Sequence, residues 1–154
     1  MLEDLPVQKL SPKNQVTLPK QHARALDGLD EGSVVCALPH FLQGADGKSF
    51  PVLVLMKESE LERRENDLRS SADLTPMQKE QRITLLNGHV RRLNLDGQRR
   101  VVLPGPFVNH IRIQKDLFLY SNNLTVQIWN PEDYKTYSAG LYAQNALSGG
   151  LLMI

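Results

Sequence analysis

The amino-acid sequence predicts an α+β fold that is mainly β with short helices, in which two related halves share one swapped-hairpin (double-split) β-barrel. Three observations lead to this prediction. A short motif of a turn, an apolar strand and a proline occurs twice, at residues 8–19 and 93–104. Later runs in each half are rich in the branched and aromatic residues that favour strands. Each half is also too small to bury a core of its own, so the two are expected to pair their sheets.

The first half contains four short runs with the composition of strands, at residues 7–10, 16–18, 34–38 and 52–56. Ser11, Pro12 and Asn14 are turn formers, so the first two runs are expected to make a hairpin. Pro19 lacks an amide hydrogen and suits the first turn of a helix, so the second strand should stop there. The stretch PHFLQGADGKSF, which precedes the fourth run, is expected to be an extra loop.

The second half repeats this order of elements. Asp96-Gly97 is a strong signal for a tight turn between two strands. Pro104 occupies the same place after the second strand as Pro19 does in the first half. Later strands are expected at residues 117–120 and 125–129, followed by a short helix.

A polar segment connects the two halves. Residues 58–86 are expected to form two linked helices, with Leu61 and Leu68 on one face. Helix starts are indicated by three capping patterns, namely Ser59 with Glu62, Thr75 with Gln78, and Asn130 with Asp133.

The two halves can be aligned residue by residue. The repeated motif matches Leu10 with Leu95, Ser11 with Asp96, Gln15 with Arg100, and Pro19 with Pro104. Farther along, residues 34–35 are matched with 118–119, and residues 53–58 with 126–131. Because side chains alternate along a strand, Val101 and Leu103 should face the core and Val102 should face solvent.

This organisation divides the chain into four parts. A first module is expected at residues 5–60, a helical connector at 61–87, a second module at 88–138 and a tail at 139–154. The tail is apolar but interrupted by glycines. It either packs on a neighbouring subunit or is disordered, and the sequence leaves both possibilities open.

Composition and motifs argue against several classes of protein. The chain has 154 residues, of which 41% are apolar and 23% charged, one cysteine and a formal charge of +1, as expected for an ordinary cytoplasmic protein. It shows no secretory signal or membrane span. Its four histidines have no metal-binding spacing, and no nucleotide or nucleophile motif occurs. We therefore predict no catalytic residue, metal, cofactor or small-molecule substrate. Trp129 is interpreted as a core or interface anchor.

Positive charge collects in the two related segments. Residues 5–25 contain four lysines and arginines and no carboxylate, whereas residues 88–115 contain six against Asp96 alone. Such clustering is the pattern expected of a surface that contacts phosphates. The alternative is that these residues form two ordinary solvated faces.

The repeated segments resemble the MraZ family of transcriptional regulators, which are built from two tandem SpoVT/AbrB-like modules. The resemblance runs from about Val7 to Tyr137. The family motif is an aspartate, three residues, an arginine and a strand that ends in proline, and DGQRRVVLP, from Asp96 to Pro104, matches it. Arg99 stands where glycine is usual. In the first half, Ser11 replaces the aspartate and Gln15 replaces the arginine.

The resemblance implies a regulator that binds double-stranded DNA through its arginine-bearing turns and assembles into ring-shaped homo-oligomers. Its expected location is the cytoplasm, on the nucleoid. Family members typically recognise repeated short boxes upstream of the division and cell-wall gene cluster that contains their own gene. The alternatives are an AbrB-like antitoxin and a ring-forming interaction scaffold that has lost DNA binding.

The candidate DNA-binding residues lie in both motifs. Asp96 is expected to hold Arg100 toward a phosphate or a guanine edge, unless Asp96 only caps the turn and Arg100 only closes a local ion pair. Gln15 could donate to phosphate or read an adenine edge. The full set of candidates is Arg100, Arg99, Asp96, Lys13, Gln15, Asn14, Lys9, Arg91 and Arg92, with the second half expected to dominate.

Overall fold

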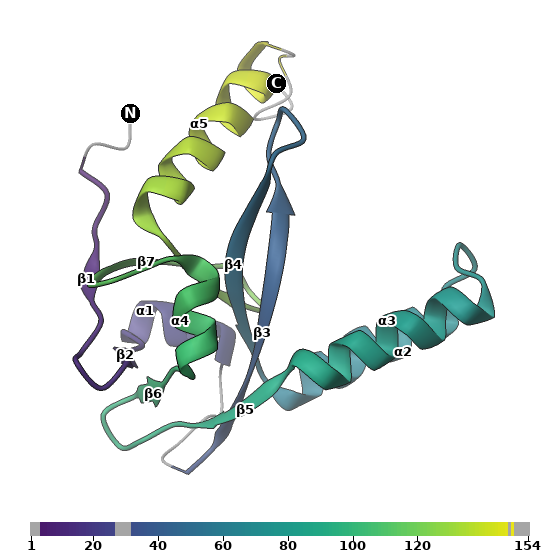
Figure 1. Cartoon of the computed structure of the whole chain (residues 1–154), viewed down its shortest axis with the longest axis horizontal. Helices are drawn as coiled ribbons and strands as arrows, with labels where there is room; N and C mark the ends of the chain where they lie inside the picture. Colours follow the sequence, from purple (N-terminus) through teal and green to yellow (C-terminus); the bar gives the residue numbers. More distant parts are fainter. Residues whose placement is uncertain (1–3, 27–31, 148, 150–154) are drawn as a thin grey trace.

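The computed structural model describes residues 4–26, 32–147 and 149. Its strands form one six-stranded antiparallel sheet and one two-stranded ladder (Figure 1). The sheet has the order β1 (Gln8–Lys9), β7 (Asp116–Ser121), β8 (Val126–Trp129), β4 (Ser49–Met56), β3 (Val34–Gln43) and β5 (Arg91–Asn94). The ladder pairs β2 (Gln15–Thr17) with β6 (Arg100–Val102).

The two halves exchange strands. β1, from the first half, pairs with β7 of the second, and β5, from the second half, pairs with β3 of the first. The strands of the two halves correspond as β1 with β5, β3 with β7 and β4 with β8. When each strand is replaced by its counterpart, the order of the six-stranded sheet is the same read from the other edge. The sheet therefore has an approximate internal two-fold symmetry, with its centre between β4 and β8. The predicted exchange of strands between halves is confirmed.

The strand registers test the alignment of the halves. Val16 lies opposite Val101 in the ladder, and Val54 lies opposite Gln127 where β4 meets β8. Both pairs join residues that the alignment had matched, as a two-fold arrangement requires.

The alignment of residues 34–35 with 118–119 was wrong by two positions. Cys36 pairs with Met56 while Phe118 pairs with Trp129, so Cys36 is the true counterpart of Phe118. A slip of two residues keeps every side chain on the same face of a strand, so the pattern of apolar residues could not reveal it.

One core lies between the sheet and the ladder and draws on both halves. Val16, Val35, Leu117 and Ile128 are all fully buried in a single cluster. Leu103 is 1% exposed in this cluster whereas Val102 is 53% exposed, so the predicted alternation along the second motif is confirmed. A second cluster, centred on Trp129, lies on the other face of the sheet, which confirms the prediction that this residue is an anchor.

Short helices close the core after each ladder strand. α1 (Lys20–Ala23) continues into the 3-10 helix η1 (Arg24–Leu26), and α4 (Gly105–Ile111) is the counterpart in the second half. They begin immediately after Pro19 and Pro104, as the missing amide hydrogens predicted. Phe107 and Ile111 of α4 point into the shared core.

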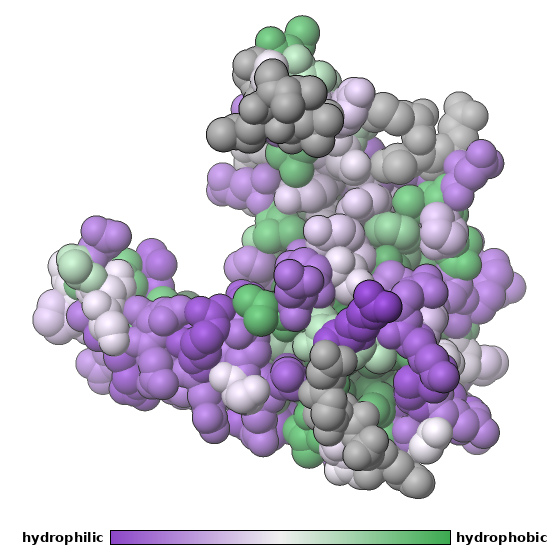
Figure 2. All heavy atoms as spheres, turned by 180° about the vertical axis from the view of Figure 1, so that it is seen from behind, coloured by the Kyte–Doolittle hydropathy of each residue, from purple (hydrophilic) through white to green (hydrophobic). Residues whose placement is uncertain are grey.

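The connector forms a helical hairpin that projects from the sheet (Figure 1). α2 (Glu58–Ser70) and α3 (Pro76–His89) confirm the two predicted helices, and Thr75 and Gln78 form the predicted capping box. The Ser59 cap was wrong, because the helix begins at Glu58 with no side-chain cap. The face of this projection seen in Figure 2 is largely hydrophilic.

Glu60 is a buried carboxylate near the start of α2, paired with two arginines of the same helix. Its buried carboxylate accepts hydrogen bonds from Arg63 at 2.7 and 2.8 Å and from Arg64 at 2.8 Å. These arginines, Arg63 first, lower the pKa of Glu60 from 4.5 to about 2 despite its burial. The carboxylate therefore stays charged where burial alone would favour its neutral form.

Two elements are longer than the sequence suggested. Residues 39–43, predicted as a loop, extend β3 beside β4, where Pro39 is tolerated because β5 pairs with β3 only as far as Ala37. α5 (Pro131–Leu147) continues through much of the predicted tail. Its Tyr134 and Tyr137 pack on Trp129, which ties the helix to the sheet. Residues 148 and 150–154 of that tail lie outside the described residues.

Within the described residues, each helix is too short or too polar to span a bilayer.

We predict that Leu103→Ala lowers the free energy of unfolding by about 2–5 kcal/mol, because it leaves a cavity in the core that both halves build. Val102→Ala, one residue away on the exposed face, is the matched control and should change it by less than about 0.5 kcal/mol. Urea denaturation followed by circular dichroism measures both. Equal losses would contradict the assignment of inner and outer faces.

Candidate nucleic-acid interface

The loops before β2 and β6 have the same backbone hydrogen bonds. The amide of Ser11 donates to the carbonyl of Gln15 (3.1 Å), and the amide of Asp96 donates to that of Arg100 (3.0 Å). Across the ladder, the amide of Leu18 donates to Arg99 and that of Leu103 donates to Asn14, each at 2.8 Å. Each loop is therefore held by the strand of the other half.

Both loops also pass through the left-handed backbone region at one residue. Asn14 has a φ of 60° and Arg99 has a φ of 56°. Asparagine tolerates this conformation better than most residues, whereas an arginine is strained in it. The glycine usual at the Arg99 position in the resembling family is explained by this geometry. Here the Arg99 guanidinium gains a compensating contact, because Nε donates to the carbonyl of Leu18 at 3.0 Å.

Asp96 organises the second loop through both carboxylate oxygens. Oδ1 accepts the amides of Gln98 and Arg100, both at 2.8 Å, and Oδ2 accepts Nε of Arg100 at 2.7 Å. The backbone amide of Arg100 is the main cause that lowers the pKa of Asp96 below its usual value. Both expected roles of Asp96 occur together: it caps the turn and it fixes the Arg100 guanidinium.

Arg100 remains partly accessible in this arrangement, since its side chain is 37% exposed. Asp96 engages Nε, and the two terminal nitrogens make no hydrogen bond with any residue that the structure describes. These terminal nitrogens form the fork that recognises phosphate or guanine. The ion pair therefore holds the guanidinium at Nε and leaves the fork of its two terminal nitrogens available.

Ser11 plays only part of the Asp96 role in the first loop. Its hydroxyl oxygen accepts the amides of Lys13 at 3.3 Å and Gln15 at 2.9 Å. A hydroxyl has no second oxygen to hold the side chain of Gln15. The first loop therefore has the same turn as the second loop, but the side chain of Gln15 is not held as that of Arg100 is.

The outer face of the β2/β6 ladder carries four side chains. Gln15 lies opposite Val102, and Thr17 lies opposite Arg100. Val16 and Val101 point the other way into the core. Sequence reasoning did not include Thr17, although the match of β2 with β6 could have identified it as the counterpart of exposed Val102.

The remaining candidate DNA-binding residues differ in whether another residue of the chain already holds their charge. Lys13 is exposed in the first loop and forms no ion pair within the described chain. Lys9 pairs with Asp116, and Arg92 donates to Glu58 at 2.6 Å, so a carboxylate compensates each of these charges. Arg91 donates to the carbonyls of Gly88 and Val90, which holds it at the base of α3.

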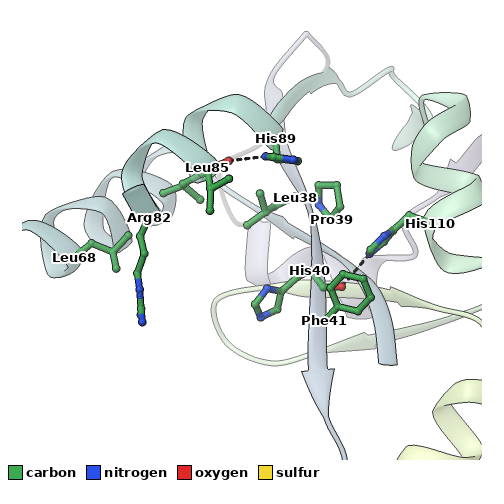
Figure 3. Close-up of a pocket in the computed structure, with 10 residues that line it drawn as sticks. Leu38, Pro39, His40, Phe41, Leu68, Arg82, Leu85, His89 and His110 are labelled. Carbon is green, nitrogen blue, oxygen red and sulfur yellow. Dashed lines mark hydrogen bonds between the residues drawn. The ribbon is translucent and has the colours of Figure 1, made fainter. Parts of the chain in front are cut away.

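A separate groove lies between the connector and β3 (Figure 3). It has a volume of about 620 Å³ and is mainly apolar, with Phe41 57% and Leu85 59% exposed at its edges. His40, His89 and His110 line it although they are far apart in sequence. Burial is the main cause that lowers the pKa of His40.

The groove histidines do not form a metal site. Nε2 of His110 contacts the carbonyl of His40 at 2.9 Å, and Nδ1 of His89 contacts that of Leu85 at 2.9 Å, so one ring nitrogen of each of these two histidines is directed to the backbone. Among the described residues, no group of three or more metal-ligating side chains is placed to hold an ion.

Comparison with known proteins identifies relatives of the chain. Residues 86–148 match the family described as "MraZ protein, putative antitoxin-like". The chain is 28% identical over 126 residues to the transcriptional regulator MraZ of Alkalilimnicola ehrlichii, covering 82% of this chain and 78% of that protein. It is 27% identical over 131 residues to the transcriptional regulator MraZ of Haemophilus influenzae, covering 84% of this chain and 80% of that protein.

The family match coincides with the second half, which contains the complete motif, and the two longer alignments extend into the first half. Together they show that the chain is similar to MraZ proteins over most of its length.

Proposed function

We propose that this protein is a DNA-binding transcriptional regulator whose second loop, ordered by Asp96, makes the principal contact. The observation that carries this proposal is the state of Arg100, whose stem is fixed by Asp96 and whose fork has no partner within the described chain. A guanidinium held in this way loses little conformational freedom on binding, so more of its interaction energy contributes to affinity. The names of the relatives, transcriptional regulators, support the same proposal.

The shape of the ladder suits a duplex. The major groove of DNA admits a two-stranded β-ribbon, and the outer face of β2/β6 is such a ribbon, flanked by the loops that carry Lys13 and Arg99. In this proposal Lys13 and Arg99 contact phosphates beside the groove. Arg92 keeps its terminal nitrogens, as Arg100 does, because Glu58 holds it through Nε alone, but Arg92 and Lys9 lie on β5 and β1, outside the ladder and its loops, so we rank them below Lys13.

The finer proposal concerns targets and assembly. We propose that the protein acts in the cytoplasm, on the nucleoid, at repeated boxes upstream of the division and cell-wall gene cluster that contains its own gene. Copies joined in a ring would present several loops to such repeats, so weak single contacts would add up through avidity. This arrangement allows a chain with a formal charge of only +1 to bind DNA well.

A second candidate function is that of an antitoxin, which the words of the family description favour. The apolar groove would then receive a small partner protein. Co-purification of a defined toxin, encoded beside this gene and released by a change at Phe41, would support it.

Selection of genomic fragments by the purified protein tests the proposed target. Tandem boxes ahead of the chain's own gene should be enriched. Affinity for these boxes should fall steeply as salt rises, because neutralised phosphates release counterions. A ring-forming scaffold that has lost DNA binding would retain no fragment even at low salt.

We predict that Arg100→Ala weakens binding to the selected boxes by about 1–3 kcal/mol if the fork contacts a base. Arg69→Ala is the matched control, because Arg69 also pairs with a carboxylate four residues away but lies on the connector. Fluorescence anisotropy titrations at fixed salt compare the two. Unchanged affinity of the Arg100 variant would remove it from the interface.

Asp96→Asn separates the two roles of the carboxylate. The amide oxygen can still accept the backbone amides of Gln98 and Arg100, so the loop and the melting temperature should change little. The charge that fixes the guanidinium is lost, so we expect affinity for the boxes to fall about 3- to 10-fold, the order of the net contribution of one hydrogen bond. Full retention of affinity would show that the fork needs no support.

The groove offers a test of assembly, with a second copy as the proposed occupant. Phe41→Ser combined with Leu85→Ser should shift the oligomer to a smaller mass in light scattering, because it removes exposed apolar area from the groove. Met77→Ser is the control, since Met77 is 70% exposed on α3 but does not line the groove. An unchanged mass would exclude the groove as the subunit interface.

A further inference from the structure

The internal symmetry makes Gln15 the structural counterpart of Arg100. Both begin the second strand of their motif, and both directly follow the residue in the left-handed region. Their amides bond to equivalent oxygens, that of Gln15 to Ser11 at 2.9 Å and that of Arg100 to Asp96 at 2.8 Å. The two side chains therefore leave the ladder from equivalent backbone positions, on the same outer face.

The chemistry of the two side chains differs in a way that matters for DNA. Arginine offers two parallel donors, which match the O6 and N7 acceptors of guanine. Glutamine offers one donor and one acceptor, which match N7 and the amino group of adenine. The amide of Gln15 makes no side-chain hydrogen bond to another residue in the part of the chain that the structure describes, so both of its functions are available.

The neighbours on this face are compatible with contact to base edges. Thr17 can donate or accept a hydrogen bond, and Val102 can pack on the methyl group of thymine. No carboxylate lies among the four outward residues of the ladder. A carboxylate there would repel phosphates and favour cytosine.

We propose that Gln15 is a specificity-determining residue, which selects adenine at one position of the DNA site while Arg100 selects guanine at another. This inference rests on the proposed function. In this proposal, the replacement of arginine by Gln15 in the first motif changes the base that the motif prefers. The internally symmetric ladder would then recognise an asymmetric DNA sequence.

The register sets the spacing of the two bases. Gln15 and Arg100 are diagonal neighbours across the ladder, because Gln15 pairs with Val102, two residues beyond Arg100. Diagonal neighbours lie about 7–8 Å apart. Successive base pairs are about 3.4 Å apart along the duplex. The adenine and the guanine should therefore lie about two base-pair steps from one another.

The experiment is a selection from random duplex DNA, followed by titrations of duplexes that differ at one base pair. It uses the full-length protein and three variants, namely Gln15→Ala, Gln15→Arg and Arg100→Gln. Gln81→Ala, an exposed glutamine on the connector helix α3, is the control. Thermal unfolding verifies that each variant is folded.

The wild-type protein should prefer adenine at one position by about 5- to 100-fold, as expected for one bidentate contact. Gln15→Ala should abolish this preference and leave the guanine preference intact. Gln15→Arg should convert the adenine position to guanine, and Arg100→Gln should convert the guanine position to adenine.

Two results would overturn the inference while leaving DNA binding in place. One is that Gln15→Ala lowers affinity equally for all duplexes, which is the signature of a phosphate contact. The other is that it changes nothing, which would exclude contact. Failure of the wild-type protein to bind any duplex above the nonspecific level would instead overturn the proposed function itself, and the inference with it.

Discussion

The pairing of Val16 with Val101 is the contact on which the rest of the structure depends. It lies at the centre of the β2/β6 ladder, where the two halves meet, and both side chains are buried in the shared core. The inward direction of this pair fixes the outward direction of Gln15 and Arg100, since neighbours alternate along a strand. Burial of apolar side chains on one face of the ladder therefore places these polar side chains on the other face.

The candidate interface combines rigidity with exposure. The six-stranded sheet, with strands exchanged between the halves, makes each loop part of the opposite half, so neither loop can move without disturbing the shared core. Asp96 adds a local constraint by holding Arg100 at Nε. Ser11 gives Gln15 the same backbone without that restraint. A symmetric scaffold therefore carries two unlike side chains, and the proposed difference in base preference follows from their chemistry.

Electrostatic compensation divides the basic residues into two groups. Arg92 and Lys9 are paired with carboxylates, as are Arg63 and Arg64 at the base of the connector. Arg100 is paired as well, with Asp96, so Lys13 and Arg99 are the cations near the ladder that form no ion pair within the described chain. The sequence alone cannot make this distinction, because the partner carboxylates are distant: Lys9 pairs with Asp116 and Arg92 with Glu58.

The sequence by itself determined the repeat, the order of the elements, the inward positions of the second motif and the turn residue Asp96, because these depend on local chemistry and on the alternation of side chains. Tertiary structure decided the features that the local sequence pattern leaves open. Strand pairing set the offset of two residues between β3 and β7, which alternation cannot detect. Packing of Tyr134 and Tyr137 on Trp129 tied α5, which runs on beyond its predicted end, to the sheet, and the fold brought His40, His89 and His110 to one groove. Such features arise from contacts between segments far apart in the chain, and no local signal encodes them.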